Sequence, residues 1–373
     1  MNSVHAKRLL SLDAFRGLTI AAMILVNSPG TYRAVYPQLR HAEWNGWTFT
    51  DTIFPAFLFI MGISTVFSLA AGKERGVSDY ALDLQIVKRT LLLFALGLFI
   101  NSYPIFHLST MRIPGVLQRI ALCYLFTCII IRSSNLKGRV FWLGGLLTSY
   151  WILMFYVPTP DIGAGVLEPG RNFAAYIDSL FLSGHMWTHY ETWDPEGLIG
   201  TIPAIATTLF GVLTGDLLRS PLSDRAKTTW MLFAAAMLLA LGAVLNQWLP
   251  INKNIWTSTF SIFMAGLSLL VLAPFYWIID AKGYRRWAVP FVIFGVNSIA
   301  IYFLSEVLDT SLRFVRLSQP GGGTISLRAY VYWTCFAPLA KPENASLIFA
   351  IVFVLAMFVI AWAMWKKRLF IKV

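Results

Sequence analysis

His41 is the residue of this chain best suited to act as a general base. It lies in the segment HAEWNG (residues 41–46), where amide, carboxylate and tryptophan side chains are close in sequence. An imidazole titrates near neutral pH and can take a proton from an attacking nucleophile. Asn27 ends the preceding apolar run and can donate a hydrogen bond to a developing oxyanion. A histidine between Trp44 and Trp47 is also typical of the aromatic belt at a membrane surface, and the residues alone leave both interpretations open.

Acidic and amide residues form a candidate acceptor-binding set. Asp194 and Glu196 lie in an acidic turn, WDPEG (residues 193–197), which can attract a cationic amine. Such groups also serve as helix caps or as hydrogen bonds between helices, and this alternative stays open for each of them. The predicted acceptor-binding residues are Trp44, Asn45, Asp51, Asp194, Glu196, Asn254, Asn297 and Glu306.

Basic and polar residues beside apolar runs are candidate ligands of an anionic cofactor. Arg119 ends RIPGVLQR (residues 112–119), and an arginine inside a membrane must be paired or must line a water-filled path. Arg16 follows Asp13 by one helical turn in SLDAFRG (residues 11–17). The alternatives are an interhelical ion pair for Arg119 and a helix cap with a snorkelling side chain for Asp13 and Arg16. The predicted cofactor-binding residues are Asp13, Arg16, Lys88, Arg89, Gln118 and Arg119.

No metal site or disulfide framework is predicted. The five histidines show no metal-ligand spacing. Cys123 and Cys128 fall inside one apolar run and Cys335 falls outside it, so free thiols are expected.

The composition predicts which elements position these side chains. Of 373 residues, 57% are hydrophobic and 13% are charged, and the mean hydropathy is +0.65, which excludes an ordinary soluble domain. Backbone groups in hydrocarbon must be hydrogen-bonded within their own segment, and the chain lacks the alternating pattern of barrel strands. The expected fold class is all-α, a polytopic membrane bundle of about ten transmembrane helices, or eleven if residues 326–339 also span the membrane.

Ten spans are predicted within a single domain, residues 1–373. If Ser326–Leu339 were an eleventh span, the basic cluster Lys366–Arg368 would face outward, so an amphipathic helix on the outer surface is preferred. The predicted spans are Ala14–Asn27, Thr52–Ala71, Val87–Asn101, Gly115–Ile131, Val140–Val157, Leu198–Leu218, Trp230–Leu249, Trp256–Ile279, Ala288–Leu308 and Ala345–Trp365.

The distribution of basic residues predicts the orientation. Lysine and arginine in short loops are retained on the cytoplasmic side, so both termini are expected to be cytoplasmic. We also expect a retained first helix instead of a cleaved signal peptide, and contact with anionic lipid but not with nucleic acid. The predicted inner residues are Lys7, Arg8, Lys73, Arg75, Lys88, Arg89, Arg132, Lys137, Arg139, Arg219, Arg225, Lys227, Lys282, Arg285, Arg286, Lys366, Lys367, Arg368 and Lys372. The longest predicted outer loop carries Asp161, Glu168, Asp178, Glu191, Asp194 and Glu196 against Arg171.

Blocks along nearly the whole chain resemble one family. Residues 8–64 contain SLDAFRG, ILVN, HAEWNGWTFTD and FPAFLFIMGIS. The later blocks are RIPGVLQRIALCY, WDPEGLIGTIPAI, NKNIWTS and FGVNSIAIYFLSEVL. In this order they are similar to the transmembrane acetyltransferases typified by lysosomal heparan-α-glucosaminide N-acetyltransferase. SLDAFRG alone is less specific, because other membrane acyltransferases begin with something similar.

The resemblance implies transfer of an acetyl group from cytoplasmic acetyl-CoA to the amino group of glucosamine or a terminal glucosaminide on the far side. It implies that His41 is catalytic, that Asn27 accompanies it, and that the protein can form a homodimer. Together with the predicted topology, it places the CoA phosphates near Arg16, Lys88 and Arg89. His41 either deprotonates the amine for direct attack on the thioester or forms an acetyl-histidine intermediate.

The length and charge pattern suit a bacterial inner-membrane protein whose outer side is the periplasm. The lysosomal enzymes carry a lumenal N-terminal domain, which this chain is expected to lack. Free glucosamine or amino-sugar oligosaccharides are therefore the expected acceptors, in keeping with N-acetylglucosamine utilisation. Two other classes remain. An amino-sugar transporter would take up sugar without acetyl-CoA, and an O-acyltransferase of surface glycans would differ only in its acceptor.

Overall fold

The computed structural model describes residues 9–189, 192–319 and 322–371. The predicted inner residues Lys7, Arg8 and Lys372 and the predicted outer residue Glu191 lie outside this part of the chain. The described residues are mostly helical, which confirms the predicted class, and all ten predicted spans fall on helices.

Short connections, such as residues 75–78, 134–135 and 220–223, alternate with longer loops, such as residues 28–48, 103–115 and 246–257. The long helices are α1 Leu10–Asn27, α2 Phe49–Glu74, α3 Asp79–Ser102, α4 Val116–Ser133, α5 Leu136–Tyr156, α7 Thr201–Arg219, α8 Asp224–Leu245, α9 Ser258–Phe275, α11 Ser298–Phe314 and α13 Pro342–Lys366. The short ones are α6 Phe173–Leu182, α10 Val289–Val296 and α12 Leu327–Val331. Two small antiparallel hairpins join β1 Leu167–Glu168 to β2 Arg171–Asn172 and β3 Arg316–Ser318 to β4 Thr324–Ser326.

Within the described ranges, seven helices are long and apolar enough to cross a membrane: α1, α2, α4, α7, α8, α9 with the π-helical turn Tyr276–Ala281 that extends it, and α13. An eighth span results if α10 and α11 are one segment, bent by 68°. Helices α3 and α5 coincide with two further predicted spans, at 24 and 21 residues, but both carry basic residues in their first half. The count of ten and the cytoplasmic termini therefore stay predictions.

Ser326–Leu339, the alternative eleventh span, is short. It consists of α12, a π-helical turn Tyr332–Phe336 and a 3-10 turn Ala337–Leu339. At 1.5 Å per residue, these helical turns reach roughly 20 Å, less than the roughly 30 Å of hydrocarbon. The segment packs against α11 and α13 at the edge of the bundle.

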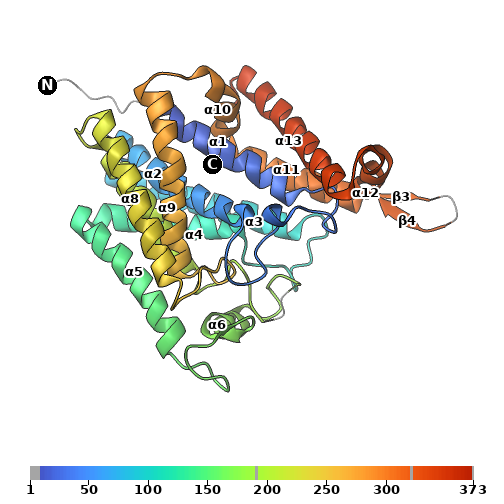
Figure 1. Cartoon of the computed structure of the whole chain (residues 1–373), viewed down its shortest axis with the longest axis horizontal. Helices are drawn as coiled ribbons and strands as arrows, with labels where there is room; N and C mark the ends of the chain where they lie inside the picture. Colours follow the sequence, from blue (N-terminus) through green and yellow to red (C-terminus); the bar gives the residue numbers. More distant parts are fainter. Residues whose placement is uncertain (1–8, 190–191, 320–321, 372–373) are drawn as a thin grey trace.

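Helices α2 and α7 are the most deeply buried spans and pack against each other. Helix α1 packs closely against α10, because a Cβ atom at Gly17 would lie 1.7 Å from the Phe291 carbonyl oxygen and one at Gly295 would lie 1.9 Å from the Asp13 carbonyl oxygen. In Figure 1, α12 and the β3–β4 hairpin project at the right edge of the bundle and α6 lies at its lower edge. We call the end where α1 begins the Arg16 end, and the end where it finishes the His41 end.

Candidate active site

The cap of α2 positions a carboxylate against His41. The backbone N–H and the hydroxyl of Thr48 donate to Asp51 Oδ2 at 3.0 and 3.1 Å, in the reciprocal pattern that starts many helices. The backbone N–H of Ala42 donates to the same oxygen at 3.0 Å. The other oxygen, Asp51 Oδ1, lies 2.6 Å from His41 Nδ1. The residues that begin α2 therefore also fix an acid–histidine pair.

The Nε2 atom of His41 is the ring nitrogen that can act as a base, because Nδ1 lies against Asp51. The Asp51 side chain is fully buried, whereas 49% of the His41 side chain is exposed. Because Nδ1 faces a carboxylate it carries the proton, and Nε2 is left with a lone pair that can accept one. Burial and then Lys253 lower the pKa of His41 from its ordinary 6.5, while Asp51 and Glu196 act in the opposite direction. The imidazole is therefore neutral at pH 7 and can act as a base.

The loop before α9 is hydrogen-bonded to the segment that carries His41. Asn252 Nδ2 donates to Asn45 Oδ1 at 3.1 Å, and Asn254 Nδ2 donates to the Glu43 carbonyl at 3.2 Å. Asn45 and Asn254 were predicted to bind an acceptor. In the structure they join the loop before α9 to the segment that carries His41, and acceptor binding by them stays a prediction.

Trp44 connects the same segment to the acidic turn. Its indole Nε1 donates to the Leu167 carbonyl at 2.9 Å. Its ring meets the Trp193 ring edge-on, with centroids 5.1 Å apart. The structure thus brings the turn that begins at Trp193 next to the His41 segment, as a shared acceptor site requires.

Arg112 clamps the carboxylates of the acidic turn. Its Nε and Nη2 atoms donate to the two carboxylate oxygens of Asp194 at 2.8 and 2.6 Å, and Nη2 also donates to Glu196 Oε2 at 2.6 Å. Burial would raise the pKa of Glu196, but Arg112, followed by Lys253 and Arg119, holds it below the usual 4.5. Both carboxylates are bound to Arg112, so a cationic amine could bind them only if one of these ion pairs broke first.

Asp178 and Arg119 accept from and donate to backbone groups in and beside the acidic turn and so hold it in place. The backbone N–H groups of Asp194 and Leu198 donate to Asp178 at 3.2 and 2.9 Å, and burial raises the pKa of Asp178 to about 6. Arg119 Nη2 donates to the Gly197 carbonyl at 2.9 Å, and the guanidinium lies 5.0 Å from the centre of the Trp256 ring. Arg119 therefore lies at the His41 end of the bundle, and its binding of the cofactor stays a prediction.

Asn27 is held by Glu306 at the end of α1. Asn27 Nδ2 donates to Glu306 Oε1 at 3.0 Å, and the Tyr32 hydroxyl donates to the Asn27 carbonyl at 2.7 Å. An amide nitrogen carries two hydrogens, so the contact with Glu306 orients the group and leaves one N–H for a ligand. Tyr302, one turn earlier on α11, is close enough to interact electrostatically with both Glu306 and Glu196. Tyr302 is thus near both the Asn27–Glu306 pair and Glu196 of the acidic turn.

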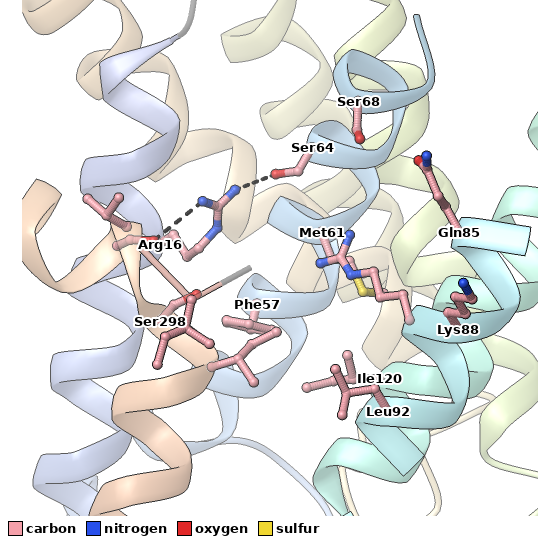
Figure 2. Close-up of a pocket in the computed structure, with 15 residues that line it drawn as sticks. Arg16, Phe57, Met61, Ser64, Ser68, Gln85, Lys88, Leu92, Ile120 and Ser298 are labelled. Atoms are coloured by element: carbon pink, nitrogen blue, oxygen red, sulfur yellow. Dashed lines mark hydrogen bonds between the residues drawn. The ribbon is translucent and has the colours of Figure 1, made fainter. Parts of the chain in front are cut away.

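A cavity of about 500 Å³ opens at the Arg16 end, within the size range of small-molecule sites. Arg16 lines one wall, and Gln85 and Lys88 line the opposite one (Figure 2). Arg89 also lines the cavity, and its guanidinium lies 4.5 Å from the centre of the Tyr124 ring. Three of the predicted cofactor-binding residues are therefore brought together, and their charges suit a phosphorylated ligand.

Arg16 is oriented by its neighbours. Its guanidinium donates to Asp13 Oδ1 at 3.1 Å and to the Ser64 hydroxyl at 2.5 Å. Asp13 therefore acts on the cavity through Arg16. Gln118 is buried beside Gly97 and Gly115 on the α3–α4 contact, apart from these cations.

A narrow apolar void continues from the cavity toward the His41 end. Cavity and void share Phe57, Ile120 and Ile299, and the void is further lined by Met23 and Tyr302. Met23 and Tyr302 each precede a member of the Asn27–Glu306 pair by one helical turn. The void therefore ends about one turn of helix from the groups at the His41 end.

Asn297 marks the break between α10 and α11 and binds the chain near its C-terminus. Its Nδ2 donates to the Leu369 carbonyl, and its Oδ1 accepts the backbone N–H of Ile371, both at 2.9 Å. Ile371 lines the large cavity. Asn297 was predicted to bind the acceptor, but the structure places it at the Arg16 end, apart from the other predicted acceptor residues.

The cysteines have the predicted state. Cys123 and Cys128 are buried, Cys335 is exposed, and all three are free thiols. In the described ranges of the chain, no group of three or more His, Cys, Asp or Glu side chains is arranged to hold a metal ion.

Fold and site together define a class of protein: a multi-pass membrane protein with an acid–histidine pair at one end of its bundle and a cationic cavity at the other. The sequence profile described as "Heparan-alpha-glucosaminide N-acetyltransferase, catalytic" matches residues 8–249. The chain therefore belongs to this family, which confirms the resemblance seen in its sequence blocks.

Two curated relatives carry the name heparan-alpha-glucosaminide N-acetyltransferase. The Mus musculus protein is 32% identical over 424 residues, covering 99% of this chain and 61% of its own length. The Homo sapiens protein is 32% identical over 365 residues, covering 82% of this chain and 54% of its own length. The chain thus spans between half and two thirds of the relatives that it matches.

Proposed function

We propose that this protein transfers the acetyl group of acetyl-CoA to the amino group of glucosamine or a terminal glucosaminide, with donor and acceptor entering from opposite ends of the bundle. The observation that carries the proposal is the His41–Asp51 pair at one end and the cationic cavity at the other, with the narrow void between them. The names of the two relatives support an acetyltransferase that acts on a glucosaminide.

Acetyl-CoA is the proposed ligand of the large cavity. Arg16, Lys88 and Arg89 supply three positive charges for its phosphates. The apolar void of about 10 Å³ marks the direction toward His41, and the side chains that line it must move apart to admit the pantetheine arm. We place this end in the cytoplasm, because basic residues gather there, such as Arg132 in the last turn of α4 and Arg286 just before α10. In a bacterial inner membrane, the His41 end then faces the periplasm.

The proposed reaction uses His41 as a general base. The acceptor nitrogen forms a bond to the thioester carbonyl carbon while His41 Nε2 takes a proton from that nitrogen. The Asn27 amide donates a hydrogen bond to the oxyanion that forms. When the carbon–sulfur bond breaks, the CoA thiolate recovers the proton from His41, and N-acetylated sugar leaves. An acetyl-histidine intermediate would replace the direct attack by two transfers at the same Nε2 atom.

The proposed acceptors are free glucosamine and amino-sugar oligosaccharides. His41 is half-exposed, and its segment carries the partly exposed rings of Trp44 and Trp47, which suit a sugar. An O-acyltransferase would use the same donor end and the same base, so acceptor chemistry alone distinguishes it.

The break between α10 and α11 is the feature that most favours a transporter, since broken helices often bind transported substrates. Here, however, both polar atoms of the Asn297 amide at the break are bound to the backbone of Leu369 and Ile371. The break therefore fastens the chain near its C-terminus, and we prefer the acetyltransferase.

The direct test incubates purified protein with acetyl-labelled acetyl-CoA and glucosamine and measures labelled N-acetylglucosamine. Wild type and His107→Ala, a substitution of an exposed histidine in the loop after α3, should both form product. His41→Ala should lower the rate at least about 100-fold, the usual contribution of a general base. Equal rates for wild type and His41→Ala would refute the proposal, and label transferred equally to glucose would identify an O-acyltransferase.

A further inference from the structure

Lys253 is fixed beside His41 by hydrogen bonds on both sides of it in the chain. Asn252 and Asn254 donate to Asn45 and Glu43 of the His41 segment at 3.1 and 3.2 Å. The backbone of the two segments is also paired, since the N–H of Gly46 donates to the Ile251 carbonyl at 2.7 Å. These contacts hold the backbone of Lys253 beside the His41 segment, and its side chain is partly buried there.

The charges around His41 differ in how they are engaged. Asp51 on α2 is bound to His41 itself, and Glu196 in the acidic turn is bound to Arg112. Lys253 interacts electrostatically with His41, Asp51 and Glu196. Arg40 and Glu43 are charged residues of the His41 segment itself. Lys253, in the loop before α9, is thus the cation that acts on the His41–Asp51 pair, in which the Asp51 carboxylate is buried.

We propose that Lys253 is a positioning residue of the active site, whose ammonium group offsets the charge of Asp51 and keeps the His41 imidazole neutral and ready to accept a proton. This proposal rests on the proposed role of His41 as a general base.

The sign of the effect follows from the charges. A buried carboxylate at 2.6 Å favours the imidazolium form, in which a base is already protonated and inactive. The nearby ammonium group disfavours that form and so offsets Asp51, while Asp51 still orients the ring. Removing the Lys253 charge should therefore raise the pKa of His41 and reduce the fraction of neutral base in mildly acidic solution.

The test compares full-length wild type, Lys253→Met and Lys253→Arg. Methionine keeps much of the apolar stem and removes the charge, whereas arginine keeps the charge. The first readout is the rate at which diethyl pyrocarbonate modifies His41 as a function of pH, because only neutral imidazole reacts. Reaction of the other histidines is subtracted with His41→Ala. The second readout is the pH profile of kcat/KM for acetyl transfer.

In Lys253→Met, the midpoint of both profiles should move to higher pH, and in Lys253→Arg it should return toward the wild-type value. A Lys253→Met variant that loses activity but keeps both midpoints would overturn the proposal, because a merely structural role does not change how His41 titrates. If the modification midpoint moves while the kcat/KM profile stays in place, Lys253 acts on His41 as proposed and the role of His41 as base is wrong.

Discussion

Replacing Asp51 by asparagine tests the acid–histidine pair most sharply. An amide has one acceptor oxygen and one donor nitrogen. The backbone N–H groups of Ala42 and Thr48 both require an acceptor, so the amide oxygen should face them and the amide nitrogen should face His41. His41 Nδ1 must then accept a hydrogen bond, which leaves the proton on Nε2, the atom that has to act as the base.

The expected loss can be given a size. A base held in the wrong tautomer loses most of its contribution, so kcat should fall by about 10² to 10⁴. Asp51→Asn also exchanges a charged acceptor for a neutral one at the start of α2 and should lower the free energy of unfolding by about 1–3 kcal/mol. The two effects are separable, since the first appears in kcat and the second in the thermal midpoint.

The matched control is Thr48→Ala. It removes the hydroxyl that lies within hydrogen-bond distance of both Asp51 Oδ2 and the Arg40 carbonyl but leaves the carboxylate against His41. It should cost about 1 kcal/mol of stability, the usual value of a helix cap, and change kcat less than about threefold. Initial rates with saturating acetyl-CoA and glucosamine measure both variants. If Asp51→Asn keeps kcat within threefold of wild type, Asp51 does not set the state of His41 and the reasoning fails.

Three further outcomes are expected. Because the pKa of His41 is lowered, kcat/KM should fall with decreasing pH only below 6.5, and a fall that begins above this value would contradict the assignment. The pKa of Asp178 is raised from 3.8 to about 6, so its carboxyl group stabilises the fold fully below pH 3.8 and loses this contribution as pH rises through about 6. The thermal midpoint of wild type should therefore fall relative to that of Asp178→Asn between about pH 4 and 7, and parallel curves would count against a shifted Asp178. Asn297→Ala should release the backbone of Leu369 and Ile371, and with it the Ile371 wall of the cavity, and raise KM for acetyl-CoA about 5- to 10-fold without changing kcat. An unchanged KM would show that this segment does not contribute to donor binding.

The fold followed from local signals. Apolar runs placed all ten predicted spans on helices, because a membrane requires long segments that satisfy their own backbone groups. The same signal could not reveal the 68° bend at Asn297, which depends on contacts with Leu369 and Ile371, residues more than seventy positions away. The apolar pattern also could not decide whether α3 and α5 span the membrane, because basic residues in their first halves make them less apolar.

The site was predictable where its parts are close in sequence. His41 and Asp51 are ten residues apart, on either side of a helix start, and both were selected. Arg112, Asp178 and Lys253 were missed, because their importance comes from partners brought near by tertiary packing. An arginine that precedes an apolar helix and a run of acidic residues elsewhere gave no indication in the sequence that they pair. Arg119 was selected as an arginine that must be paired or must line a water-filled path, but its partner, the Gly197 carbonyl, is known only from the structure.

Transfer across a sealed bilayer tests the central claim most directly. Purified protein is reconstituted into vesicles with glucosamine trapped inside, and acetyl-labelled acetyl-CoA, which does not cross the bilayer, is added outside. The proposed arrangement, with the donor in the cavity lined by Arg16, Lys88 and Arg89 and the acceptor beside His41, predicts labelled N-acetylglucosamine inside the vesicles and none with His41→Ala. Product that forms only when donor and acceptor are supplied on the same side would contradict it.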